Sequence, residues 1–109
     1  MKRLYLIFFP LIACAPYSGT FEGLPTVIIP VYCETLESGN LGFKCTDQKG
    51  YCTAEAKWDG DKCRIRICKE FTDREDILIH EKCHCFCEAK GEGSGHGDNC
   101  FKECERRKE

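Results

Sequence analysis

The chain has few aliphatic residues beyond its first third. Burying one Leu or Ile side chain stabilises a fold by only about 1.5–3 kcal/mol, whereas ordering each residue costs on the order of 1.5 kcal/mol. A hydrophobic core alone therefore cannot hold the chain folded. Cross-links are expected to dominate, because each disulfide can add roughly 2–4 kcal/mol. The aliphatic side chains after Cys33 are essentially Leu36, Leu41, Ile65, Ile67, Ile77, Leu78 and Ile79.

Three further absences narrow the classes of protein. The chain has no basic excess, since 16 Lys and Arg stand against 18 Asp and Glu, so nucleic acid is not an expected partner. It has no long apolar run after its N-terminal segment, so no membrane association is expected. It has no Asn-x-Ser/Thr acceptor, so N-glycosylation is not expected.

The N-terminal residues 1–19 have the pattern of a secretory signal peptide, which predicts a secreted, extracellular protein. Two basic residues precede an apolar run over residues 4–15, which is shorter than the about 20 residues that span a bilayer. Cleavage after Ser18 or Gly19 is preferred to cleavage after Ala15, which would leave a proline first. Residues 11–14 also resemble a bacterial lipobox, in which Cys14 would be lipidated.

Ten of the 11 cysteines lie beyond that segment. An even number in a short exported chain predicts complete pairing, although ten cysteines allow about 945 connectivities. We expect a small disulfide-rich, mainly β fold, in which short hairpins are cross-linked by about five disulfides. The expected disulfide cysteines are Cys33, Cys45, Cys52, Cys63, Cys68, Cys83, Cys85, Cys87, Cys100 and Cys104.

The densest cluster of cysteines is KCHCFCEAK, residues 82–90. Zinc sites usually pair their ligands as C-x-x-C or H-x-x-x-H, whereas these cysteines alternate. On an extended strand they would share one face, and each would reach a different part of the chain. The pattern predicts a disulfide knot with no metal ligand and no cofactor. His84, and His96 in a glycine-rich loop, are interpreted as exposed polar side chains.

Three segments follow the signal peptide. Residues 20–32 are expected to form an extended N-terminal arm that packs over the core or, less favoured, binds a partner. Residues 33–70 form a β-hairpin lobe, because turn signals separate strands at residues 41–45, 51–58 and 62–70. In the last strand, Ile65 and Ile67 should face the core, and Arg64 and Arg66 should face solvent or a partner.

Residues 71–109 are expected to form a second cysteine-rich lobe with a glycine-rich loop and a charged tail. Thr72 and Glu75 have the spacing of a capping box, so a short helix over residues 73–80 is one interpretation. The run Ile77-Leu78-Ile79 before the cysteines favours β or irregular structure instead. Cys100 and Cys104 could hold a C-terminal turn of helix.

The residues do not suggest a catalytic constellation. A nucleophile needs an adjacent base and an oriented third group, and the serines lie in the signal segment or in turns. We therefore expect a non-enzyme that acts by binding. Binding energy concentrates on Trp, Tyr and Arg, and the nearest such cluster is Tyr51, Trp58, Arg64 and Arg66. The interpretation favoured over binding is that Trp58 fills the core and that the arginines form a solvated strand face.

Two resemblances to known proteins follow from these features. WDGDKC before a cysteine strand resembles a von Willebrand factor type C module, although CHCFC replaces its central C-x-x-C-x-C and no vicinal cysteines occur. The signal peptide, PTVIIPVYC, ten cysteines over residues 33–104 and the charged tail resemble cysteine-rich proteins of tick saliva. Within that group the chain is similar to the CirpT family of complement inhibitors.

The CirpT resemblance implies immune evasion by binding of a host plasma protein. The partner would be complement component five, whose docking to the convertase, or cleavage by it, would be blocked. We expect a monomer. A secreted serine-protease inhibitor is the alternative, with Arg64, Arg66 or Arg74 inserted into an active site, although the first two lie in a predicted strand. A toxin is disfavoured by the acidic net charge.

Overall fold

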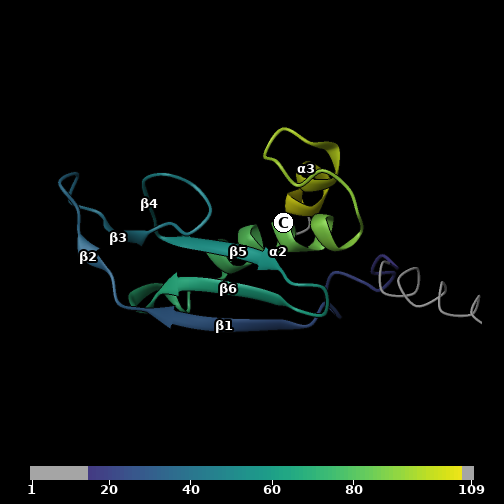
Figure 1. The fold of residues 1–109 in the computed structure, drawn as a ribbon, viewed down its shortest axis with the longest axis horizontal. Helices are drawn as coiled ribbons and strands as arrows, with labels where there is room; N and C mark the ends of the chain where they lie inside the picture. The colour runs from purple at the N-terminus through teal and green to yellow at the C-terminus, as the bar shows by residue number, and fades with distance from the viewer. Residues whose placement is uncertain (1–14, 107–109) are drawn as a thin grey trace, which may run out of the picture.

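The computed structural model describes residues 15–106, so most of the expected signal peptide lies outside the described residues. The main sheet has the strand order β1-β6-β5 (Figure 1). Its strands are β1 (Thr26–Val31), β6 (Cys63–Cys68) and β5 (Ala54–Trp58). The first two are parallel, and the last two form an antiparallel hairpin. The mainly β, disulfide-rich fold that was expected is confirmed.

A second, smaller sheet lies at one end of the main sheet (Figure 1). It joins β2 (Glu34–Thr35), β3 (Leu41–Lys44) and β4 (Tyr51–Cys52) in antiparallel order. A 3-10 turn, η2 (Lys69–Phe71), leads to α2 (Glu75–Ala89) and then to α3 (Asn99–Glu105). Within residues 15–106, no helix has the length and apolar character needed to cross a membrane.

The expected arm, residues 20–32, contributes β1 to the main sheet. Pro30 lies in this strand, which is tolerable because β1 is at the sheet edge and its free side needs no donor. The arm also contributes Phe21 and Leu24 to the buried core. That core extends through β6 into α2 and reaches Phe101 of α3, so it is shared by residues on both sides of position 70.

The alternation in β6 places its side chains as the sequence predicted. Ile65 and Ile67 are fully buried, whereas Arg64 is exposed and Arg66 is half-buried on the opposite face. Helix α2 covers the isoleucine face and brings Phe86 into the same cluster. This packing positions α2 against β5, which is the arrangement on which the site below depends.

The cysteine-rich stretch is a helix, so the predicted strand over residues 83–87 and the preferred β or irregular structure before it were wrong. At 100° per residue, Cys83 and Cys87 lie on one side of α2, and Cys85 lies nearly opposite. The first two bond α3, and the third bonds β6. Alternating cysteines therefore suit a helix that is cross-linked on two sides, and tertiary cross-links outweigh the β character of Ile77-Leu78-Ile79.

Helix α2 also begins without the capping box that was considered. Its N-cap is Arg74, with no side-chain cap bond, and the hydroxyl of Thr72 donates to the carbonyl of Lys69 instead. Glu75 and Asp76 in the first turn favour the positive end of the helix dipole.

Five disulfides form, and they use the ten expected cysteines. Two hold the strands: Cys33–Cys68 joins the segment after β1 to the end of β6, and Cys45–Cys52 closes the β3–β4 hairpin. One, Cys63–Cys85, fastens the main sheet to α2. The last two, Cys83–Cys104 and Cys87–Cys100, clamp α3 against α2 and confirm the helical turn expected in the tail.

Candidate metal centre

Three histidines from two segments meet beside α3. His80 and His84 are one helical turn apart on α2, on the side that the disulfides clamp to α3. His96 comes from the glycine-rich loop between the helices. The three rings lie 4.9–5.1 Å apart, centroid to centroid, and the ring of Phe101 stacks against His84 at 4.4 Å. The Phe101 ring is apolar, and the other side of the cluster faces solvent. The imidazole nitrogens are therefore the polar groups of the cluster.

Hydrogen bonds indicate which ring nitrogens of the two helix histidines carry the hydrogen. Nδ1 of His84 lies 2.6 Å from the carbonyl oxygen of Ser94, and Nδ1 of His80 lies 2.8 Å from Oε2 of Glu105. A carbonyl or a carboxylate oxygen only accepts, so each Nδ1 carries the hydrogen. Nε2 is therefore the unprotonated nitrogen of both helix histidines when their rings are neutral, which is the form that binds a metal ion.

The histidine nitrogens could bind one metal ion if the three rings moved slightly closer together. One ligand atom from each histidine lies within 4.8 Å of the others, and Nε2 of His84 is 3.1 Å from Nε2 of His96. Nitrogens that bind a tetrahedral zinc ion lie about 3.3 Å apart. Burial lowers the pKa of His84, and the neighbouring His80 and His96 lower it further, although its bond to Ser94 opposes this. The neutral imidazole is thereby favoured.

The loop that carries His96 is more ordered than its glycine content suggests. Gly91 ends α2 with φ +79°, a conformation that favours glycine. Asp98 accepts a hydrogen bond from the backbone N–H of Gly95, and its own N–H donates to the Gly95 carbonyl. The disulfide Cys87–Cys100 closes this loop at its base. These bonds hold His96 near α2.

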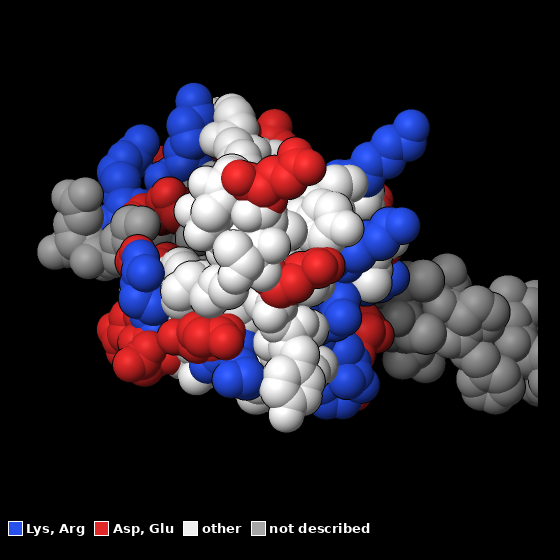
Figure 2. All heavy atoms as spheres, turned by 90° about the vertical axis from the view of Figure 1, so that its left-hand side faces the viewer, with Lys and Arg blue, Asp and Glu red and all other residues white. Residues whose placement is uncertain are grey.

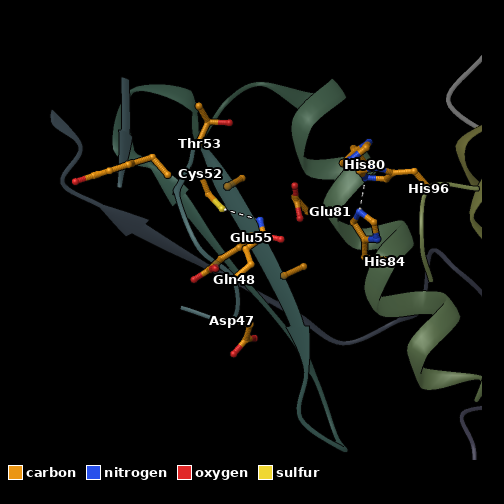
Figure 3. Close-up of a pocket in the computed structure, with 12 residues that line it drawn as sticks. Asp47, Gln48, Cys52, Thr53, Glu55, His80, Glu81, His84 and His96 are labelled. Carbon is orange, nitrogen blue, oxygen red and sulfur yellow. Dashed lines mark hydrogen bonds between the residues drawn. The ribbon is translucent and has the colours of Figure 1, made fainter. Parts of the chain in front are cut away.

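Glu81 adds a carboxylate to this region. Glu81 follows His80 in the sequence, but its side chain points toward the sheet and lies between α2 and β5 (Figure 3). Burial raises the pKa of Glu81 to about 7, and the charge of Glu55 adds to this. Among the described residues, 15–106, it makes no hydrogen bond or ion pair, so its oxygens remain available to a ligand.

A pocket connects Glu81 with the three histidines and the edge of the main sheet. Its volume is about 470 Å³, and it is lined by all three histidines, Glu81 and residues 53–56 at the start of β5 (Figure 3). Cavities that hold small ligands are typically of this size or larger. A peptide-sized group could therefore reach both the histidines and Glu81 from solvent.

Strand β5 presents a free edge to this pocket. Cys68 N–H donates to the Thr53 carbonyl, and Asp59 N–H donates to the Lys62 carbonyl, so odd-numbered residues bond to β6. In an antiparallel pair, the even-numbered residues of β5 therefore direct their N–H and C=O groups away from β6. Those residues are Ala54 and Ala56, which line the pocket. No strand within residues 15–106 pairs with this edge.

The four residues expected to bind a partner are divided between two faces. Trp58 pairs with Cys63 on the helix-facing side of the sheet, where it is partly buried against the core and lies 6.1 Å from the ring of Tyr17. Arg64 and Arg66 project from the opposite face. Tyr51 is 53% exposed in β4, at the rim of the histidine pocket. The structure therefore brings only the two arginines together.

Both arginines have acidic partners within the chain. Arg64 pairs with Asp59 at 2.5 Å and holds the pKa of that carboxyl well below its usual range. Arg66 pairs with Glu55 at 2.5 Å and lies over the ring of Phe43. Arg74, the third candidate for insertion into a protease, pairs with Asp76. Figure 2 likewise shows basic and acidic side chains interspersed on one face of the molecule.

His80 and Glu81 were not among the expected site residues, although the sequence contains a motif that indicates them. Residues 80–84 read His-Glu-Lys-Cys-His, the H-E-x-x-H spacing that places two zinc ligands on one face of a helix. The predicted strand concealed it, because four residues span about 13 Å on a strand but only about 6 Å along a helix.

Comparison of the chain with protein families, curated proteins and solved structures finds no match.

Proposed function

We propose that this chain is a secreted, zinc-dependent hydrolase that cleaves peptide bonds. The observation that carries the proposal is the H-E-x-x-H stretch on α2, with His96 brought to the two helix histidines. Catalytic zinc sites use three protein ligands and keep a fourth position for water. In the H-E-x-x-H arrangement the glutamate serves as the general base. This proposal departs from the expectation of a non-enzyme.

Each residue has a role in the proposed reaction. His80, His84 and His96 would hold the zinc ion, which lowers the pKa of a bound water and polarises the scissile carbonyl. Glu81 would accept one proton of a water molecule as the oxygen of that water bonds to the carbonyl carbon. The proton would then pass to the leaving nitrogen as the C–N bond breaks, which gives an amine and a carboxylic acid. The acid would ionise to a carboxylate by releasing the second proton of the water to solvent or to the amine.

The free edge of β5 supports a peptide as the substrate. An extended peptide can add to an exposed strand edge through main-chain hydrogen bonds, and Ala54 and Ala56 direct such groups toward the pocket. Their small side chains leave room beside the edge. A substrate bound there would lie alongside Glu81 and the histidines, since all of these residues line one pocket.

The remaining expectations stay predictions. The five disulfides support an oxidising compartment, which agrees with the secretion that we propose. Inhibition of complement component five rests on the overall cysteine pattern, and serine-protease inhibition has no further support, because all three candidate arginines are paired within the chain.

The test uses oxidised protein loaded with Zn²⁺ and a mixture of unfolded protein substrates, with new peptide ends detected by mass spectrometry. The variant Glu81→Gln should keep its zinc but lose hydrolysis by about 10²–10⁴-fold, the contribution of a general base. The variant His84→Ala should lose zinc and hydrolysis together. Glu75→Gln, an exposed position on the same helix, is the matched control and should behave like the wild type.

Zinc binding without any cleavage by the wild type would contradict the hydrolase proposal and leave a metal-binding protein. No zinc binding at all would contradict the metal centre itself. Unchanged cleavage by Glu81→Gln would remove this residue from the reaction.

A further inference from the structure

We infer that Glu105 is a positioning residue of the metal centre, acting through His80. The inference rests on the zinc site proposed above. Glu105 is the last residue of α3, and its Oε2 lies 2.8 Å from Nδ1 of His80. The two residues are 25 positions apart in the chain, so their contact depends on how α3 is held against α2.

The hydrogen bond between Glu105 and His80 is held in place by a neighbouring disulfide. The residue before Glu105 is Cys104, which is bonded to Cys83, and Cys83 lies on the same side of α2 as His80. The side chains of His80 and Glu105 are 34% and 27% exposed, so water competes only partly for their hydrogen bond. Within residues 15–106, most ion pairs join neighbours on the chain or across a hairpin, whereas this one joins two helices.

The hydrogen bond between Glu105 and His80 is of the kind that metal-binding histidines usually make. A ligating histidine usually donates its other ring N–H to a carboxylate or a carbonyl, which fixes the ring and makes the ligating nitrogen more basic. Glu105 supplies that partner for His80, and the Ser94 carbonyl supplies it for His84. These bonds leave Nε2 as the unprotonated nitrogen of each neutral ring, and for His84 this nitrogen faces Nε2 of His96 at 3.1 Å. Of the two partners, only Glu105 is a side chain, so it can be changed by substitution.

A simpler role is that the pair only fastens α3 to α2. The two disulfides between these helices already do so, and surface ion pairs contribute little beside them. The two roles predict different results. A fastening role would lower the stability of the metal-free protein, whereas a positioning role would lower zinc affinity and leave that stability nearly unchanged.

The experiment measures zinc affinity by competition with a chromophoric chelator, and thermal unfolding of the metal-free, oxidised protein. The variants are Glu105→Ala, Glu105→Gln and, as a control on the same helix, Glu103→Ala, whose side chain is exposed. Glu105→Ala should weaken zinc binding about 10–100-fold. Glu105→Gln keeps an oxygen that accepts from Nδ1–H and should recover part of that loss. All variants should unfold at nearly the same temperature without metal.

Each outcome separates this inference from the proposed function. A wild type that binds no zinc contradicts the metal centre. A wild type that binds zinc, together with unchanged affinity in Glu105→Ala, overturns the positioning role alone. The same holds if Glu105→Ala loses stability without metal and Glu105→Gln recovers no zinc affinity, because that pattern describes a fastening contact.

Discussion

Nε2 of His84 lies 3.1 Å from Nε2 of His96, although a glycine-rich loop separates the two residues on the chain. Two neutral imidazoles at this distance share one hydrogen, and a metal ion would replace that hydrogen with bonds to both nitrogens. Disulfides at both ends of this arrangement keep the rings together before any ligand arrives. Site geometry that exists in advance reduces the cost of binding.

Zinc should stabilise the folded protein through these nitrogens. A ligand that binds only the native state adds about 2.7 kcal/mol when its free concentration is 100 times its dissociation constant. The thermal unfolding temperature of the wild type should therefore rise with Zn²⁺ and return to its starting value with a chelator. His96→Ala should remove most of this rise without changing the unfolding of metal-free protein, since His96 is exposed. An equal rise in wild type and variant would exclude His96 as a ligand.

Two of the disulfides should differ in their effect on zinc affinity. Removing Cys63–Cys85 by a double change to Ala should cost about 2–5 kcal/mol of unfolding free energy, but it leaves α2 and α3 clamped and zinc affinity nearly intact. Removing Cys83–Cys104 should cost a similar amount and also weaken zinc binding, because this bond holds Glu105 beside His80. Denaturant unfolding and zinc titration of both variants test this. Equal zinc affinity in the two would show that the clamp does not shape the centre.

Complete reduction should unfold the chain, as expected from its small aliphatic content. Among residues 15–106, the buried core has few large apolar side chains, because nine of its sixteen residues are cysteines or alanines. Circular dichroism of the reduced protein should therefore lose its native signal. A reduced sample that keeps this signal would show that the core is sufficient.

Acid should remove the stabilisation that Glu55 provides. Burial raises the pKa of this carboxyl, but hydrogen bonds from Thr46 and Arg66, with the charge of Arg66, together lower it below 4.5. A carboxyl whose pKa is lower in the folded state stabilises the protein above its unfolded pKa, and this contribution is lost as the pH falls through the folded pKa. The stability difference between wild type and Glu55→Gln should shrink as the pH falls below about 4.5. A stability difference that grows in acid would contradict a lowered pKa for Glu55 in the folded state.

Tyr17 should belong to the mature protein. Its backbone N–H donates to the Ala89 carbonyl at 2.8 Å, and its ring contacts Trp58 and Phe86. Cleavage after Ser18 or Gly19 would remove these contacts, whereas cleavage after Ala15 would keep them. If the chain is exported as proposed, N-terminal sequencing of the exported protein should therefore find a start before Tyr17.

The same contacts predict a cost when the ring is removed. Tyr17→Ala should lower the free energy of unfolding by about 1–2 kcal/mol, since its aromatic contacts and half-buried ring are lost. Tyr32→Ala, at a residue 85% exposed, is the control and should cost less than about 1 kcal/mol. Equal effects of the two changes would contradict a structural role for Tyr17.

The amino-acid sequence by itself determined the disulfide-rich class, the participation of ten cysteines and the inward face of β6. These features follow from local rules, because cysteine number and two-residue alternation need no knowledge of distant contacts. The tertiary structure alone decided that residues 83–87 are helical, because cysteines two apart fit both a strand and a helix cross-linked on opposite sides. With that helix, His80 and His84 became neighbours, and the clamp to α3 added His96 and Glu105. The candidate site depends on contacts between distant residues, and sequence spacing does not encode which disulfides bring them together.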